Sequence, residues 1–126
     1  MVAVNRWLEY CLSKPGAWQD EPWEGDVVAK VGPVSGGAKI FAFLGSAADS
    51  ASLGLKCGNR EAADLWLERY PGSVARMAYL GQHGWNTFRL DGSIADDELA
   101  ELIDASYALV VAALPKSRRP SSPAGP

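Results

Sequence analysis

Two cysteines and one histidine are the residues that could most readily form a nucleophile and its base: Cys11, Cys57 and His83. A catalytic thiol needs a base beside it and surroundings that stabilise the thiolate. Cys11 falls within an apolar pattern of helical period, and Cys57 ends a strand-like run, so both thiols are expected to be buried. Nothing in the sequence pairs Cys57 with His83, and the cysteine spacing is not that of a metal site. We predict no catalytic residue and no disulfide, as is usual in a reducing compartment.

A run of acidic residues, uninterrupted by any basic residue, is a second candidate for chemistry. Its members are Asp91, Asp96, Asp97, Glu98, Glu101 and Asp104. A hard cation or a catalytic carboxylate pair needs oxygens that converge from several directions. Acids along one helix do not converge, whereas acids in its first turn stabilise the positive end of the helix. We therefore predict a solvated helix face, no metal site and no cofactor.

The glycine-rich segment 32–39 has some features of a phosphate-binding loop. Ala38 stands where that motif needs lysine, and Ile40 stands where it needs serine or threonine. The residues that follow predict a strand, whereas a phosphate loop leads into a helix. We expect a hairpin loop.

Length and charge limit the class of protein. The 126 residues, 48% of them hydrophobic, fit a single domain with an apolar core. Twelve Lys and Arg against fifteen Asp and Glu give a net charge of −3, which excludes a strongly basic polyelectrolyte binder. No apolar run reaches the roughly 18 residues that cross a bilayer, and the N-terminus lacks a secretory signal pattern. We expect a cytoplasmic protein with no membrane partner, and the sequence carries no signal for its oligomeric state.

The distribution of basic residues is uneven. Residues 53–90 contain five bases and three acids, whereas residues 91–105 contain six acids and no base. Such asymmetry can leave one basic face on an acidic protein, which would hold nucleic acid weakly and mainly through phosphates. The candidate contacts are Lys30, Lys39, Lys56, Arg60, Arg76 and Arg89. The alternative is that these are ordinary exposed bases with no ligand.

Five tryptophans are many for a chain of this length. Trp7 and Trp66 fall on apolar helical faces and are expected in the core. Trp18, Trp23 and Trp85 fall on strand or loop segments and could line a groove. Such aromatic side chains would stack on bases or contact a small apolar ligand equally well, and core packing is the alternative for Trp85.

Periodicity and turn residues predict the elements that must position these side chains. We expect helices over residues 4–13, 60–70 and, after a capping box formed by Ser93 and Asp96, up to Leu114. We expect strands over residues 17–23, 26–31, 39–44, 52–57 and 85–90, with an irregular segment over 73–84. Clustered strands with short links favour an α+β domain: a twisted antiparallel sheet with helices packed on one face. Residues 1–115 would form this single domain, and the Pro- and Ser-rich residues 116–126 a flexible tail.

Two helical stripes should build the core. In the second helix we expect Asn59 as the N-cap and a buried face of Ala62, Leu65, Trp66 and Tyr70. In the last helix the stripe should pack against the strand at 40–44. Its members are Leu99, Leu102, Ile103, Ser106, Tyr107, Val110, Val111 and Leu114.

Three segments, in this order and spacing, resemble the MmcQ/YjbR family of small bacterial proteins. They are KPGA at 14–17, LGLKC at 53–57, and GWNTFRLDGS at 84–93, the last followed by EL at 98–99 and LIDASY at 102–107. The resemblance spans roughly residues 4–115. It implies a fold like that of the bacterial frataxin CyaY, and DNA binding through a double-wing arrangement of strands. Members often place a basic residue and a histidine directly before the tryptophan, but here Gly84 separates His83 from Trp85, so no role passes to His83.

Two functions follow as expectations. The first is a non-enzymatic binding module that binds DNA. The second is a binding protein for a small apolar ligand, held in a groove between the sheet and the helices.

Overall fold

The computed structural model describes residues 2–23, 26–46 and 52–120. Its helices are α1 (Val2–Leu12), α2 (Arg60–Arg69) and α3 (Asp96–Ala113), with short 3₁₀ helices η1 (Gly81–His83) and η2 (Lys116–Arg118). Its strands are β1 (Ala17–Trp23), β2 (Asp26–Val31), β3 (Lys39–Ser46), β4 (Ser52–Lys56), β5 (Val74–Arg76) and β6 (Trp85–Arg89). The predicted helices and strands are confirmed to within two residues at each end. The segment expected to be irregular also contains β5 and η1.

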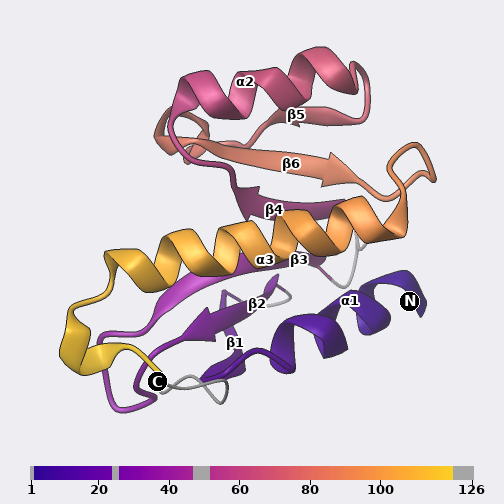
Figure 1. Ribbon diagram of the computed structural model, residues 1–126. Coiled ribbons are helices and arrows are strands. Elements are labelled where there is room, and N and C mark those ends of the chain that lie inside the picture. Colours follow the sequence, from indigo (N-terminus) through magenta and orange to yellow (C-terminus); the bar gives the residue numbers. More distant parts are fainter. Residues whose placement is uncertain (1, 24–25, 47–51, 121–126) are drawn as a thin grey trace.

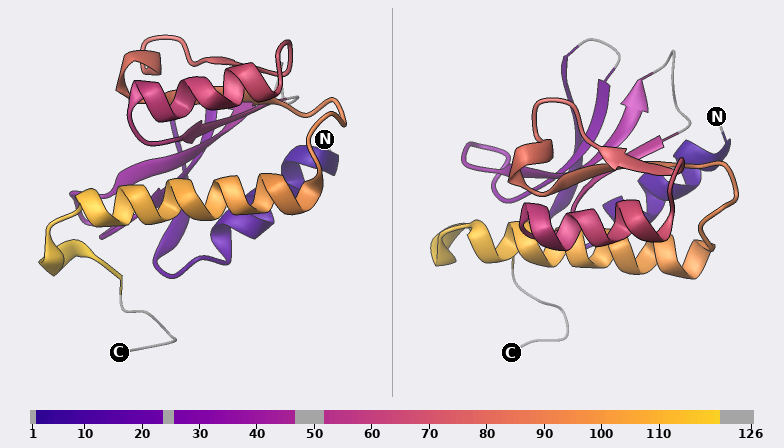
Figure 2. Two further views of the ribbon diagram at one scale, coloured as in Figure 1. Left: turned by 45° about the horizontal axis from the view of Figure 1, so that its top comes forward. Right: turned by 90° about the horizontal axis from the view of Figure 1, so that it is seen from above.

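The strands form one antiparallel sheet in the order β1-β2-β3-β4-β6-β5. The three helices lie side by side on the same face of this sheet (Figures 1 and 2). Helix α1 packs against β1–β3, α3 crosses β2–β4, and α2 covers β5 and β6. The predicted α+β fold, with helices on one face, is confirmed.

A bulge in β3 decides which residues face the helices. Ala29 of β2 pairs with Ala42 and Lys30 pairs with Ile40, so Phe41 is an extra residue in β3. Phe41 and Ala42 are both fully buried, and the Phe41 ring contacts Tyr107 of α3 edge-on, with ring centres 5.2 Å apart. The next residue, Phe43, therefore points to the side of the sheet away from the helices.

We call this second side the open face. It is defined by the cross-strand neighbours Phe43, Gly54 and Thr87, which pair in register across β3, β4 and β6. Because side chains alternate along a strand, Lys56, Trp85 and Arg89 belong to the same face.

Most of the predicted stripe of α3 fills the core as expected, whereas its members Tyr107 and Val111 are only partly buried. Leu99, Leu102, Ile103, Val110 and Leu114 are all at most 5% exposed and pack with residues of β3 and β4. Ser106, the polar member of the stripe, is also fully buried. Its hydroxyl donates to the carbonyl of Phe41 at 2.6 Å and accepts from the amide of Lys56 at 2.9 Å. It thereby hydrogen-bonds backbone groups of two strands, β3 and β4, and has its own polar atom paired although it is buried.

The predicted buried face of α2 is partly wrong. Leu65 is 64% exposed, whereas Ala63 is fully buried and its carbonyl accepts a hydrogen bond from Asn86 of β6. Trp66 and Tyr70 are only partly buried. The helix lies over the outer strands of the sheet, so only a narrow face of it meets the core.

The predicted capping box of α3 is wrong. The N-cap is Ala95, whose methyl side chain cannot accept a hydrogen bond from the first turn of the helix. The Ser93 hydroxyl instead accepts a hydrogen bond from the Ser73 hydroxyl at 3.0 Å. The backbone amide of Ser93 donates to the Asp91 carboxylate. Three acids in the first turn, Asp96, Asp97 and Glu98, still lie at the positive end of the helix as expected.

The first part of the predicted tail is structured. Beyond α3 the chain forms η2, and Arg119 folds back so that its guanidinium donates to the carbonyls of Leu114 and Ala112 at 2.9 and 3.0 Å. Pro120 lies against Gly16, where an added Cβ would come within 2.7 Å of it. The expectation of a flexible tail is thus wrong for residues 116–120, because this segment hydrogen-bonds the open end of α3. The remaining residues, 121–126, lie outside the described part of the chain.

Within the described ranges, no helix is both long enough and apolar enough to span a membrane.

Candidate nucleic-acid interface

The six bases predicted to contact phosphate are divided between the two sides of the sheet. Lys30, Lys56 and Arg89 point to the open face, as their register with neighbouring strands shows. Arg60 and Arg76 lie on the helical side, where both contact Asp64 of α2. Lys39 is exposed at the start of β3, next to the hairpin loop. The structure therefore does not bring the six candidate bases together on one face.

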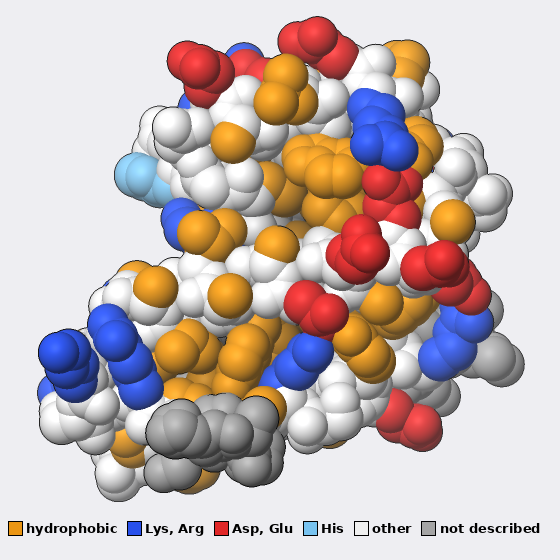
Figure 3. All heavy atoms as spheres, viewed as in Figure 1, with side chains coloured by type: hydrophobic (Ala, Val, Ile, Leu, Met, Phe, Trp, Pro, Cys, Tyr) orange, Lys and Arg blue, Asp and Glu red, His pale blue; other side chains and the backbone are white. Residues whose placement is uncertain are grey.

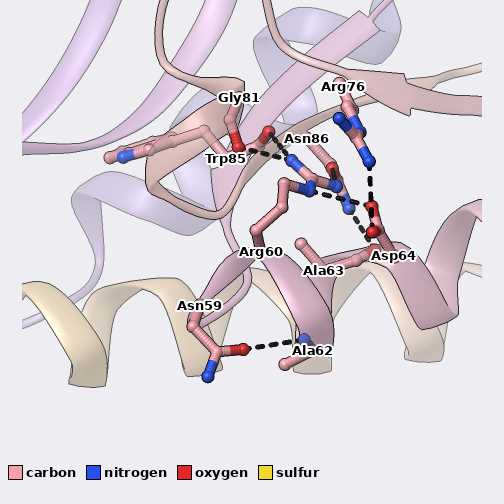
Figure 4. Close-up of polar contacts among 9 residues, drawn as sticks. All are labelled: Asn59, Arg60, Ala62, Ala63, Asp64, Arg76, Gly81, Trp85 and Asn86. Carbon is pink, nitrogen blue, oxygen red and sulfur yellow. Dashed lines mark hydrogen bonds and ion pairs between the residues drawn. The ribbon is translucent and has the colours of Figure 1, made fainter.

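Arg60 is tied into the protein itself (Figure 4). Its guanidinium donates to Asp64 at 2.8 Å, to the carbonyls of Gly81 and Trp85, and to the Asn86 side chain at 2.7 Å. Its side chain is only 18% exposed. Asn59, the preceding residue, caps α2 as predicted by accepting a hydrogen bond from the amide of Ala62. This arrangement fastens the start of α2 to β6, so we assign Arg60 to the fold rather than to a ligand.

Two lysines on the open face are held by aromatic rings. The Lys30 ammonium pairs with Asp20 at 2.7 Å and lies 5.4 Å from the centre of the Trp18 ring. The Lys56 ammonium donates to the carbonyl of His83 and lies 5.9 Å from the Trp85 ring centre. Hydrogen bonds from Lys30 and from the amide of Glu21 hold the pKa of Asp20 below its usual value. The positive charge of each lysine is therefore partly balanced by neighbouring groups of the protein itself.

Of the three tryptophans expected to line a groove, Trp18 and Trp85 contact groups of the sheet and its loops instead. The Trp18 indole donates to the carbonyl of Gly32 at 3.0 Å. Trp85 is only 8% exposed and packs edge-on against Phe43, with ring centres 5.5 Å apart. The side chain of Trp23 lies outside the described residues. Trp85 therefore belongs to the packing of the sheet, the alternative considered from the sequence.

The structure instead gathers bases at one end of the molecule. The hairpin loop between β2 and β3 approaches η2, because an added Cβ at Gly37 would lie 2.7 Å from Nε of Arg118. Figure 3 shows Lys and Arg side chains collected at this end. We define the basic end as Lys39, Lys116, Arg118 and Arg119. All four are exposed, and none forms an ion pair within the described ranges.

Three members of the basic end, Lys116, Arg118 and Arg119, were not predicted as contacts from the sequence. They fall in the segment that was expected to be a flexible tail. A signal was present in the sequence: residues 105–120 contain three bases and no acid, and residues 27–48 likewise contain no acid. The contact between the two segments is long-range, so no local pattern could show it.

The cysteines are not activated. Burial raises the pKa of both Cys11 and Cys57 to about 12, so neither thiol is ionised near neutral pH. Neither forms a disulfide. Among the described residues, no group of three or more His, Cys, Asp or Glu side chains is arranged to hold a metal ion.

A cavity between the helices and the sheet is present but small. It has a volume of about 150 Å³ and lies between α2 and α3, beside Cys57, Trp66 and Leu109. Ligand pockets usually have volumes of about 300–1,000 Å³. This cavity is therefore a poor fit to the predicted ligand groove between sheet and helices.

The comparisons with known proteins agree in one family. A family model described as YjbR matches residues 12–109. Over 120 residues the chain is 32% identical to the proteins described as "Uncharacterized protein YjbR" in Escherichia coli K12 and O157:H7, covering 94% of this chain and 95% of each relative.

Solved structures share the fold. The crystal structure of Deinococcus radiodurans protein DR2400, described with the family-model domain DUF419, has a TM-score of 0.81 and 28% identity, covering 90% of this chain and 83% of that one. A protein from Pseudomonas syringae has a TM-score of 0.65 and 20% identity, covering 84% of this chain and 97% of that one.

Proposed function

The chain belongs to the YjbR family, and from that premise we propose that it is a non-enzymatic module that binds DNA through the phosphate backbone. The basic end is the proposed contact surface. The observation that supports it is the approach of Arg118 to Gly37, which joins the bases of η2 to the tip of the β2–β3 hairpin. A hairpin with basic side chains beside it can act as a wing, a loop that lies in a DNA groove or against the phosphate backbone.

The charge distribution supports the choice of this end. The three helices carry nine acidic and three basic residues, and the acids of α3 all lie in its N-terminal half. A polyanion would be repelled there. The segments that form the basic end, residues 105–120 and the hairpin segment 32–39, contain no acid, which favours phosphate binding there.

Binding should be weak and insensitive to sequence. Lys39, Lys116 and Arg118 have no hydrogen-bond or ion-pair partner for their side-chain nitrogens within the described part of the chain, which leaves those nitrogens available to phosphate oxygens. Arg119 has part of its guanidinium committed to the end of α3. With three to four phosphate contacts, log K should fall with log salt at a slope of about −3.

The test is a titration of fluorescently labelled duplex DNA at low salt, repeated at increasing salt. We expect binding with that slope, and we expect Lys39→Ala, Lys116→Ala and Arg118→Ala each to reduce its magnitude by about one. Arg6→Ala and Arg69→Ala are the matched controls, because they remove exposed cations from the helical side. They should leave the slope unchanged. Absence of binding, or equal effects of control and basic-end variants, would contradict the proposal.

A further inference from the structure

A second site, unrelated to the basic end, lies on the open face of the sheet. A pocket of about 650 Å³ is formed there by strands β2, β3, β4 and β6 and by the segment 77–80 that follows β5. This volume falls within the range of about 300–1,000 Å³ that is usual for sites of small organic molecules. The pocket is more than four times the volume of the cavity between α2 and α3.

Gly54 determines the shape of the pocket floor. A Cβ at this position would lie 2.7 Å from the Met77 methyl carbon and 3.1 Å from Cβ of Phe43. The missing side chain thus lets Met77 lie directly on the sheet beside Phe43. The Phe43 ring packs edge-on against the buried ring of Trp85 on the same face. The floor therefore offers a thioether and an aromatic ring, both of which favour flat, polarisable ligands.

The rim of the pocket contains a strained aromatic residue. Tyr79 has a φ of +66°, the only positive φ among the non-glycine residues of the described chain. The amide of Leu80 donates to the carbonyl of Ala78 at 2.7 Å, which makes Tyr79 the centre of a γ-turn of the rare, strained type. The Tyr79 side chain is 95% exposed, so its own packing does not offset this cost. Strain of this kind is concentrated where a residue has a functional position.

Among the described residues, one charged group lines the pocket. It is the carboxylate of Asp26, which is half-buried at the start of β2 and has no ion-pair partner within the described ranges. The remaining lining is mainly apolar or aromatic, with hydroxyls from Ser52 and Thr87. We propose that this pocket binds a small organic cation with a flat, apolar body, its positive charge directed to Asp26 and its body between Phe43, Met77 and Tyr79. The inference does not depend on DNA binding, because none of the basic end lines the pocket.

The methionine content allows a direct test. Met77 is one of only two methionines in the chain, the other being Met1. Protein labelled with ¹³C at the methionine methyl groups therefore has one methyl signal that reports on the pocket floor. We would titrate it with 2-naphthylmethylammonium, with the neutral 2-naphthylmethanol and with the anionic 2-naphthylacetate.

We expect the Met77 signal to shift on addition of the ammonium compound and of the alcohol. The dissociation constant of the cation should be two- to fivefold lower than that of the alcohol, as for a partly exposed ion pair of about 0.4–1 kcal/mol. The anion should bind most weakly. Asp26→Asn should remove the preference for the cation, whereas Asp97→Asn, which changes an exposed acid on α3, should keep it.

Three results would overturn the proposal: no shift of the Met77 signal with any of the three probes, equal binding of cation and anion by the unaltered protein, or a preference for the cation that persists in Asp26→Asn. A shift with single-stranded oligothymidine but not with the naphthyl compounds would also overturn it and assign the pocket to nucleic-acid bases. Circular dichroism of each variant verifies that the fold is retained.

Discussion

The Arg60 guanidinium donates a hydrogen bond of 2.7 Å to Oδ1 of Asn86, a fully buried side chain. The Nδ2 group of the same amide donates to the carbonyl of Ala63 at 2.8 Å. One asparagine in β6 thus binds the first residue of α2 and the carbonyl of its fourth residue. It is one of the links that hold this helix over the outer strands of the sheet (Figure 4).

Replacing this amide should weaken the fold. Asn86→Ala leaves donors of Arg60 without their acceptor and creates a small cavity, so we expect the free energy of unfolding to fall by about 2–3 kcal/mol. Urea unfolding followed by tryptophan fluorescence measures the change. The control Gln82→Ala, at an exposed position of η1, should change stability by less than about 0.5 kcal/mol. An Asn86→Ala protein as stable as the control would show that the amide does not hold α2.

Stability should depend on pH through Asp104. Burial raises the pKa of this carboxyl, but hydrogen bonds from Lys14 and Tyr10 outweigh that effect, so its pKa lies below the usual value. A carboxyl whose pKa is lower in the folded state stabilises the protein above its unfolded pKa of about 3.9, and this contribution is lost as pH falls through the folded value.

We therefore expect Asp104→Asn to flatten the loss of stability between neutral pH and about pH 3. Thermal unfolding across this range provides the measurement. Asp97→Asn is the matched control, since Asp97 is an exposed carboxyl on the same helix that forms no ion pair within the described ranges. A pH profile of Asp104→Asn that matches the unaltered protein would contradict the role assigned to the Lys14 contact.

Removing the segment after Pro115 should cost stability. Arg119 donates to two carbonyls at the end of α3, where the last carbonyls of a helix have no partner within the helix itself. We expect truncation to lower the free energy of unfolding by about 1 kcal/mol, or the melting temperature by roughly 3–5 °C. Arg119→Ala should reproduce most of this loss, whereas Arg118→Ala, which weakens DNA binding in the proposal above, should not. An unchanged melting temperature on truncation would restore the original expectation of a flexible tail.

Removing the backbone strain of the γ-turn at Tyr79 should stabilise the protein and weaken ligand binding in the pocket. Tyr79→Gly removes a side chain from a backbone conformation that glycine adopts freely, so we expect stability to rise by up to about 1 kcal/mol. The affinity for 2-naphthylmethylammonium should fall, because the aromatic rim is lost. Ala78→Gly, one residue earlier and without a positive φ, should lower stability by roughly 0.5 kcal/mol. If Tyr79→Gly is as destabilising as Ala78→Gly, the turn is not strained.

The sequence by itself predicted most of the elements and the fold class. Helical periodicity and Pro115 are local features, and they correctly indicated the α3 stripe and the end of that helix. Short links between strands likewise indicated an antiparallel sheet. The three family segments also depend on local residue types, and they led to the family that the comparisons show.

Tertiary structure alone decided which side chains meet. The extra residue Phe41 turns Phe43 to the open face, and nothing in the alternation of β3 marks that bulge. Leu65 has the larger apolar side chain, but the position of α2 at the sheet edge exposes Leu65 and buries Ala63. The approach of Arg118 to Gly37 joins segments about 80 residues apart. Such contacts depend on packing geometry, which the local periodicity of a sequence does not encode, and both the basic end and the open-face pocket arise from them.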